Sequence, residues 1–412
     1  MRQTKTAALA ALVAFLALAA TGCLKVTPYQ RPSAAVPQSF KEPPPEGWKQ
    51  AQPSDETLRG KWWEIFGDPA LNALEEQVSI SNQNVLQAEA NFREAQAAVR
   101  VARSALYPTV NGSASATGSQ ASSRLGNPIA PSPTGTYDVP VSASYTYDVW
   151  GTIHRSVTAS ANTAQSVAAL IESARLLYQA ELAEDYFQLH GSDADAALFQ
   201  QADESYKEYL QLTRDRYAGG VATDGDVAQA ETQLYTTQAQ LADLGVERSQ
   251  LEHAMAILIG KPPAELSVPS APVPFGFPRI PVSLPSALLE RRPDIADIER
   301  QAAAAYRQTV LTAFQQVEDN LAALRVLENE ASVLEQAVAS AQRALTVSTA
   351  QYKGGTGSYL QVITTQTIAL QDQRSAIDVQ TRRMTAAVLL IEALGGGWDA
   401  SQLPTVQSLA RK

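Results

Sequence analysis

The sequence has few of the residues on which enzyme chemistry depends. Its 412 residues include one cysteine and three histidines, and no histidine stands at metal-ligand spacing from another histidine or an acidic pair. Neither a Gly-x-Ser-x-Gly elbow nor a glycine-rich phosphate loop occurs. We therefore predict that the protein is not an enzyme and that it has no catalytic, metal-binding or cofactor-binding residues.

Charged and aromatic residues are also scarce. They make up 18% and 7% of the chain, and the formal net charge of −10 is spread without a basic patch. The lack of such a patch argues against nucleic acid as a partner. A chain rich in alanine, glutamine and leucine suits long, closely packed helices better than a globular enzyme core.

The single cysteine follows an uncharged, apolar run near the N-terminus. Arg2 and Lys5 precede the run from Thr6 to Ala20, and Cys23 comes three residues later. The pattern indicates an export signal over residues 1–22, and the run is too short for a spanning helix, which needs roughly 20 apolar residues. Small residues before a lone cysteine are typical of a lipobox. We therefore predict lipidation at Cys23 and, because Leu24 follows it, a place in the cell outer membrane. The alternative is a plain secretory signal with an incidental cysteine.

The remainder of the chain is an internal duplication. Tyr217-Ala218-Gly219-Gly220 matches Tyr352-Lys353-Gly354-Gly355 at an offset of 135. Each copy is predicted to hold two long helices around a Gly-Gly turn. The predicted segments are a proline-rich N-terminal linker (23–60), first-repeat helices (61–105), a β-hairpin (106–155), a first-repeat coiled-coil pair (156–261), a proline-rich connector (262–284), a second repeat (285–397) and a C-terminal tail (398–412).

The hairpin is indicated by a change of period from helical to two. Apolar and polar residues alternate from Tyr137 to Trp150, and the stretch from Thr109 to about Ser119 is the predicted partner strand. A run of this kind that ends in aromatic residues fits a membrane strand with an aromatic girdle. A soluble hairpin is the alternative, since two strands cannot form a closed barrel by themselves. The predicted girdle residues are Tyr137, Tyr145, Tyr147 and Trp150.

The helices carry a coiled-coil pattern. From Val310 to Leu345, the predicted seam positions, which include Asn320, alternate spacings of three and four over five heptads. An ordinary antiparallel bundle has the same pattern. A helix from about Val157 to Tyr217 would, however, be roughly 90 Å long, which is too long for the core of one compact domain.

Several stretches resemble the outer-membrane factors of tripartite drug-efflux pumps, the TolC-like family, and specifically its lipidated branch. They span nearly the whole mature chain: Val26–Pro32, Trp62–Leu71, Tyr147–Gly151, Leu284–Ile295 and Ala305–Phe314. The resemblance implies a mainly α fold in which long antiparallel coiled-coil helices form a periplasmic α-barrel. It also implies a homotrimer that contacts outer-membrane lipid and docks on a periplasmic adaptor protein and an inner-membrane pump.

The second repeat departs from the family pattern. Asn84-Val85-Leu86 matches Asp294-Ile295-Ala296 at an offset of 210, not 135, with the cut near Gln301. The second copy is therefore shorter by about 75 residues, the difference between the two offsets. The missing part is the counterpart of roughly Phe92 to Ser166, which leaves one membrane β-hairpin per chain where the family has two. Across the junction we expect either one long helix or a strained reversal, and no second hairpin. An error in the sequence at this junction is a further alternative.

The function implied by the resemblance is that of an outer-membrane channel for multidrug or solute efflux, a passive duct across the periplasm and the outer membrane. The missing strand pair favours an alternative, a non-conducting membrane-anchored coiled-coil scaffold or a defective truncated paralogue. By the resemblance, the adaptor-contact turns are Gly219, Gly220, Gly354 and Gly355.

The resemblance also places a periplasmic gate at the tips of the helix pairs. Its residues would be Asp224, Asp226, Leu360 and Thr364. The family's Asp and Arg stand here as Thr364 and Thr367, and a charge lock needs both signs, so we predict a weaker or apolar gate. Asp224 and Asp226 also fit a helix N-cap pair.

Overall fold

A computed structural model describes residues 32–45, 60–120, 133–270, 277–282, 285–299 and 303–411 of the chain. The predicted signal segment, Cys23 and the junction residues Gln301 and Ala302 lie outside the described residues. The described parts belong to two compact units, one with residues 93–165 and 404–411 and the other with residues 32–92 and 166–403.

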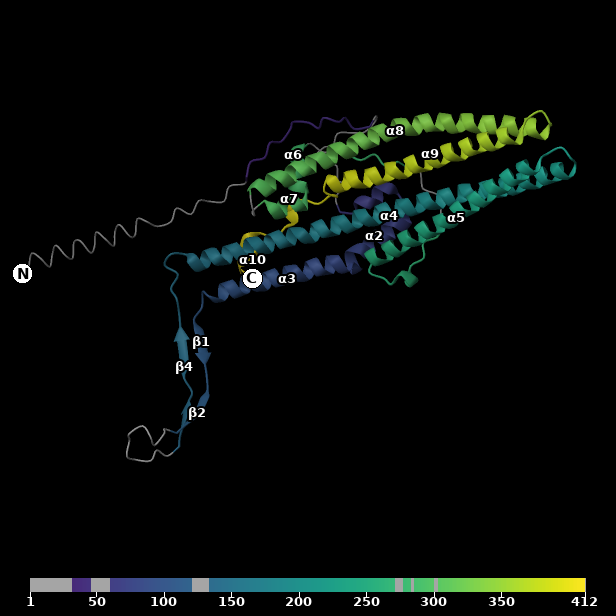
Figure 1. Cartoon of the computed structure of the whole chain (residues 1–412). Helices are drawn as coiled ribbons and strands as arrows, with labels where there is room; N and C mark the ends of the chain where they lie inside the picture. Colours follow the sequence, from purple (N-terminus) through teal and green to yellow (C-terminus); the bar gives the residue numbers. More distant parts are fainter. Residues whose placement is uncertain are drawn as a thin grey trace, which may run out of the picture. The chain divides into compact units, whose positions relative to one another are not determined.

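Long helices make up most of the described chain (Figure 1). The mainly helical fold predicted from the sequence is confirmed. The elements are η2 (Trp62–Phe66), α2 (Pro69–Ser81), α3 (Gln83–Ser104), β1 (Thr109–Gly112), β2 (Ser115–Ser119), β3 (Thr134–Asp138), β4 (Val141–Ser144), α4 (Thr152–Ala218), α5 (Asp224–Leu258), η3 (Pro263–Glu265), α6 (Pro285–Arg291), α7 (Pro293–Ile298), α8 (Ala303–Lys353), α9 (Tyr359–Ala393), η4 (Ala400–Gln402) and α10 (Val406–Arg411).

Two antiparallel helix pairs form the body of the larger unit. α8 and α9 lie side by side (Figure 1). α5 lies beside α4, and Gln238 Nε2 on α5 donates to Asp203 Oδ1 on α4 at 2.9 Å. Both α5 and α9 contain 35 residues, and their first residues, Asp224 and Tyr359, are separated by the predicted offset of 135. The duplication is therefore visible in the helices themselves.

The apolar seam predicted on α8 is buried at seven positions, while Leu334, Val338 and Leu345 are only partly buried and Asn320 requires a correction. Leu321 is fully buried, whereas Asn320 is partly exposed and donates its side-chain amide to the Gln316 carbonyl at 2.8 Å. The inclusion of Asn320 in the seam was wrong, because a straight helix drifts against a strict 3.5-residue pattern and the apolar neighbour gains more from burial. The other buried seam residues are Val310, Ala313, Val317, Leu324, Leu327, Ala331 and Ala341.

The two repeats make equivalent hydrogen bonds at their base, which is where α5 and α9 end. Asn82 Nδ2 donates to the Leu258 carbonyl at 2.7 Å, and Arg292 Nη1 donates to the Ala393 carbonyl at 3.2 Å. The two donors are related by the offset of 210 and the two acceptors by the offset of 135. The partners are 176 residues apart in the first repeat and 101 residues apart in the second. The second repeat is therefore shorter between equivalent contacts by the predicted amount.

Two helices of the second repeat share this shortening. α3 has 22 residues and its counterpart α7 has 6, while α4 has 67 and its counterpart α8, described from Ala303 onward, has 51. Arg292 Nη1 lies 2.7 Å from Gln316 Oε1. In one continuous helix these residues would be about 36 Å apart. Of the two expected alternatives, one long helix is therefore wrong and the reversal is confirmed, because α7 lies against α8.

The described strands belong to one hairpin interrupted halfway along. β1 pairs antiparallel with β4 and β2 with β3, so that Gly112 lies opposite Val141 and Ala116 opposite Tyr137. Every strand in the described part of the chain lies between positions 109 and 144. None of the described helices combines the length and the apolar character that a membrane crossing requires.

The second arm of the hairpin is shorter than predicted. The alternating pattern continues to Trp150, but β4 ends at Ser144, which pairs with Thr109. The residue before Thr109 is Pro108, which has no N–H group to extend the ladder. Strand pairing therefore stops where the partner strand can no longer donate a backbone hydrogen bond.

Candidate functional site

The candidate site is the end of the larger unit where α4 turns into α5 and α8 turns into α9. A small apolar cluster there, called the tip cluster below, is separate from the main core. Its buried members come from all four helices and are Tyr206, Leu210, Ala230, Leu234, Tyr352, Tyr359, Val362 and Ile363. The tip cluster thus joins the two turns.

Each turn depends on a glycine in the left-handed conformation. Gly220 has φ +73° and Gly355 has φ +75°, a region that residues with a side chain rarely adopt. The amides of Gly219 and Gly354 each donate to the carbonyl four residues earlier, at 3.0 and 2.9 Å. The four glycines singled out in the sequence therefore form two turns of the same geometry.

The helices after the turns begin with equivalent caps. Thr223 Oγ1 accepts from the Asp226 amide at 3.2 Å, and Asp226 Oδ2 accepts from the Thr223 amide at 2.8 Å, which is a capping box. Ser358, which matches Thr223 at the offset of 135, accepts from the Gln361 amide at 3.3 Å. The cap of α5 is thus Thr223, and the interpretation of Asp224 and Asp226 as the N-cap pair was wrong. A hydroxyl at the cap position satisfies the free amide, while both carboxylates favour the positive end of the helix.

Asp224, Asp226 and Leu360 lie in the first turns of α5 and α9, and Thr364 lies one turn farther along α9. Asp224 is exposed, and the Asp226 carboxylate is held in the capping box. Leu360 is 58% exposed, and the Thr364 hydroxyl donates to its carbonyl at 2.8 Å. None of the ion pairs among the described residues joins these carboxylates to a cation of the opposite repeat, so the gate stays a prediction.

Arg216 links the two repeats at the tip, which sequence reasoning missed. Its Nη2 donates to the Tyr352 carbonyl at 2.7 Å, and its guanidinium carbon lies 4.1 Å from the centroid of the Tyr352 ring. The Tyr209 hydroxyl and Thr349 Oγ1 are 2.9 Å apart and add a second link from α4 to α8. Within the repeat, Tyr352 corresponds to Tyr217, which is 50% exposed, so the duplicated pattern gave no sign that one tyrosine is buried.

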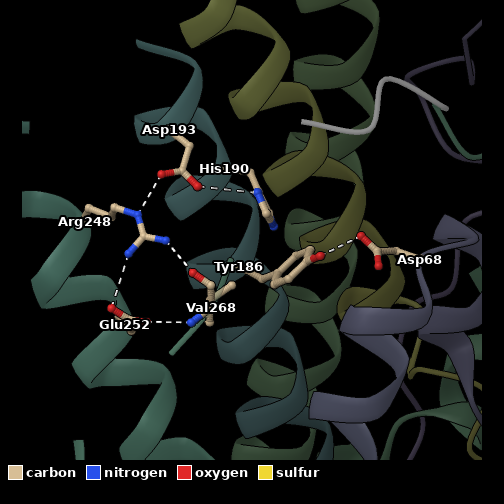
Figure 2. A network of polar contacts seen from close by, with 7 residues as sticks. All are labelled: Asp68, Tyr186, His190, Asp193, Arg248, Glu252 and Val268. Atoms are coloured by element: carbon tan, nitrogen blue, oxygen red, sulfur yellow. Dashed lines mark hydrogen bonds and ion pairs between the residues drawn. The ribbon is translucent and has the colours of Figure 1, made fainter. Parts of the chain in front are cut away.

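Farther from the tip, a polar network holds the connector against the first helix pair (Figure 2). Arg248 Nε donates to Asp193 Oδ1 at 2.7 Å, and its Nη2 donates to the Val268 carbonyl at 2.6 Å. Glu252 Oε1 accepts from the Val268 amide at 2.6 Å. α4, α5 and the segment after η3 are therefore joined through one partly buried guanidinium, whose charge is balanced by two carboxylates.

The same network continues toward η2. The Tyr186 hydroxyl donates to Asp68 Oδ2 at 2.6 Å, and the Tyr186 ring lies edge-on to His190, with centroids 4.4 Å apart (Figure 2). His190 is buried beside Asp193, with Nδ1 3.8 Å from Oδ2. His190 is thus a packing residue of the network, as its isolation in the sequence suggests.

Glu184 on α4 gives the larger unit a pH dependence. Burial, reinforced by the negative charges of Glu392 and Asp185, raises its pKa to about 7 from an ordinary value of 4.5. The folded chain therefore binds a proton that the unfolded chain releases between these pH values, so the free energy of unfolding falls as the pH rises through this window. We expect Glu184→Gln to raise the melting temperature at pH 8 while changing it little at pH 5.

Thermal unfolding followed by circular dichroism at both pH values measures this effect. Glu208→Gln is the matched control, because Glu208 is exposed on the same helix and does not contribute to the pKa of Glu184. Equal changes at pH 5 and pH 8 for Glu184→Gln would contradict the assignment of the ionisation to this residue.

The predicted girdle residues are exposed in the single chain. Tyr137 lies in β3, whereas Tyr145, Tyr147 and Trp150 follow the end of β4. Their exposed fractions range from 55% to 83%. The contact of these exposed aromatic side chains with lipid stays a prediction.

Comparison with known proteins places both repeats in one family. The model of the outer membrane efflux protein family matches residues 74–261 and 295–396, well over half of the chain. The pyoverdine export outer membrane protein OpmQ of Pseudomonas aeruginosa is 27% identical over 449 aligned positions, which cover 89% of this chain and 93% of the relative. The alignment is longer than the whole chain of 412 residues, so part of the relative has no counterpart here, in agreement with the shortened second repeat.

Solved structures share the fold. A membrane protein from Pseudomonas aeruginosa superposes with a TM-score of 0.78 at 23% identity, covering 92% of this chain and 98% of that one. The open state of the Neisseria gonorrhoeae MtrE outer membrane channel gives a TM-score of 0.75 at 19% identity, covering 92% and 99%. With two repeats, two equivalent tip turns and a family match over most of its length, the chain belongs to the outer membrane efflux protein family.

Proposed function

We propose that this protein is the outer-membrane channel component of a tripartite efflux system, a passive duct that spans the periplasm and the outer membrane. Membership of the family supports this proposal, and members of the family are channel proteins of the outer membrane rather than enzymes. The observation that carries it furthest is the pair of equivalent turns at the tip, joined by the tip cluster. Paired turns of one geometry offer a partner protein repeated contact points.

The assembly proposed is a lipid-anchored homotrimer. Lipid on Cys23 attaches each chain to the outer membrane, and the turns at Gly219, Gly220, Gly354 and Gly355 contact a periplasmic adaptor that connects to an inner-membrane pump. Asp224, Asp226, Leu360 and Thr364 then surround the periplasmic opening. Because α9 presents Thr364 and Leu360 there, the closed state relies on apolar contact more than on ion pairs.

A second function is favoured by the single hairpin. Three chains with two strand arms each supply six strands, and the side chains of an eight-stranded barrel already nearly fill it. A non-conducting scaffold that is anchored in the outer membrane and binds an adaptor would need no wider barrel.

Transport in cells separates the two functions. The protein is expressed with an adaptor and pump in a strain that lacks its own outer-membrane channels, and efflux of a fluorescent dye is measured beside adaptor capture. Restored efflux supports the channel. Capture without efflux supports the scaffold, and absence of both contradicts the proposed partnership. A full-length family member with two strand pairs, tested in the same strain, is the positive control.

A further inference from the structure

A cavity of about 560 Å³ lies beside η2 in the larger unit and shares no residue with the tip cluster. It is lined by residues of η2, α2, α4 and the turn after α9, and its volume is within the range of cavities that hold small molecules. Trp63 on η2 and Trp398 after α9 both line it, and it is called the tryptophan cavity below. Ile80 on α2 and Leu176 on α4 add apolar surface. The tryptophan cavity is therefore large enough for a ligand.

The lining of the tryptophan cavity includes hydrogen-bond donors without a partner. Trp63 is 4% exposed and Trp398 is 7% exposed, and neither indole N–H donates to any group in the part of the chain that the structure describes. The Nε–H group of Arg175, which also lines the cavity, is a third buried donor without an acceptor there. Buried indole N–H groups ordinarily have an acceptor, because leaving a donor unpaired away from water is costly. Three such donors around one cavity indicate a ligand that supplies acceptors.

The charged side chains of the lining are paired with one another. Arg175 Nη1 donates to Glu172 Oε1 at 2.7 Å, and Lys61 forms an ion pair with Glu76. Two cations and two carboxylates balance, so the lining supplies no net positive charge to hold an anion. Each carboxylate can accept more than one hydrogen bond and can therefore also take a hydroxyl donor from a ligand. The lining thus suits an uncharged ligand that has both carbonyl and hydroxyl groups.

The second tryptophan is not explained by the duplication. At the offset of 135 the counterpart of Trp398 is Pro263, whose side chain has no donor. The turn before Trp398 passes very close to α4 at Gly396, which has φ +58° and where a Cβ atom would collide with the Leu176 side chain. Glycine permits both this conformation and this approach. The second repeat therefore has its own local structure that brings an indole to the cavity.

We propose that the tryptophan cavity binds an N-acetylated sugar. Oxygens of the sugar, the acetamido carbonyl among them, accept from the indole N–H groups of Trp63 and Trp398 and from Arg175. The acetyl methyl group packs against the apolar walls, and the sugar hydroxyls donate to the two carboxylates of the lining. An acetamido group combines a strong acceptor with a methyl group, which suits a cavity lined by unpaired donors and apolar side chains. The site goes beyond the proposed efflux function and does not depend on it.

Binding of a soluble acetamido sugar tests the proposal. The full chain is purified in a detergent without sugar headgroups, because a maltoside would compete for the cavity. N,N′-diacetylchitobiose is the probe, and cellobiose, which has the same linkage but hydroxyls in place of the acetamido groups, is the matched comparison. We expect saturation-transfer NMR to give the strongest signal at the acetyl methyl groups. We also expect titration calorimetry to give a Kd at least about tenfold lower for the probe than for cellobiose, since cellobiose lacks the carbonyl acceptor.

Two conservative substitutions test the donors one at a time. Trp63→Phe and Trp398→Phe keep an aromatic ring and remove the N–H group. We expect each to raise the Kd of the probe about tenfold, the effect of one lost hydrogen bond. Trp150→Phe makes the same change at an indole that does not line the cavity, and its Kd should equal that of the unsubstituted protein. Circular dichroism verifies folding, and if one variant does not fold the other gives the same test.

Three outcomes would overturn the inference. The first is no binding of N,N′-diacetylchitobiose to the folded protein, as expected for a cavity that holds only water. The second is equal binding of cellobiose, which leaves the acetamido group without a role. The third is an unchanged Kd in a folded Trp63→Phe or Trp398→Phe protein, which places the probe elsewhere. The readout is binding rather than transport, so a protein that fails to restore efflux still gives a decisive result for the cavity.

Discussion

Cys23→Ser is expected to move most of the protein from the outer-membrane fraction to the soluble periplasmic fraction. Only one hairpin per chain is present among the described residues, so the strands bury less apolar surface in lipid than two hairpins would. Acyl chains contribute about 0.8 kcal/mol per buried CH₂ group, and stable anchoring takes more than one chain. Removing all of them therefore removes the larger part of the attachment.

Fractionation with immunoblotting measures the release, and labelling with a palmitate analogue verifies the loss of lipid. The same cysteine substitution in a family member with two strand pairs is the control, and we expect that protein to be retained more completely. Full retention of the Cys23→Ser protein in the membrane fraction would show that the hairpin is sufficient and that the lipid is dispensable for attachment.

Gly260→Ala is expected to destabilise the protein far more than Gly220→Ala. Both glycines have positive φ angles, +69° and +73°, so alanine costs each about 1–2 kcal/mol. A Cβ atom at Gly220 would meet nothing within 4 Å, whereas at Gly260 it would collide with the backbone carbonyl of Ser81. The backbone of Ser81 cannot shift without disturbing α2. We therefore expect Gly260→Ala to lower the free energy of unfolding by about 4 kcal/mol or more, as the most destabilising core substitutions do.

Urea unfolding of the detergent-solubilised protein measures both changes. The second repeat provides an independent copy of the comparison, since Gly395 approaches the carbonyl of Arg291 closely while Gly355 has open space around it. Similar losses for Gly260→Ala and Gly220→Ala would mean that the contact between α2 and the end of α5 relaxes without cost.

The duplication could be predicted from the sequence because the positions that repeat are those with strict backbone demands. A left-handed turn favours glycine, and the start of a helix favours a hydroxyl or carboxylate side chain. Gly220 and Gly355 therefore recur at equivalent positions of the two repeats and reveal the offset between them. The shortening followed from a comparison of these markers with Asn84-Val85-Leu86, whose match lies at an offset of 210 instead of 135. Local rules of this kind do not depend on which residues lie nearby in space.

What the sequence did not reveal depends on long-range contacts. The end of β4 at Ser144 is set by Pro108 on the opposite arm, not by the alternation that continues to Trp150. Arg216 and Tyr352 are 136 residues apart, and neither carries a sign of the other. Glu318 is the same kind of case, because its carboxylate accepts from the backbone amides of Lys41 and Glu42, which belong to a proline-rich segment far away in the sequence.

Because α7 and α8 are both shorter than their counterparts, the hairpin of the first repeat with the adjoining helix ends forms one exchangeable segment. By the two offsets, Ile298 corresponds to Ala88 and Ala303 to Ala168, so residues 89–167 are the piece that would fit between them. A graft there would leave the hydrogen bonds of Asn82 and Arg292 and the two tip turns in place. Proteins built from antiparallel helix pairs can in this way change the number of strands that they present without altering the surface that meets their partners.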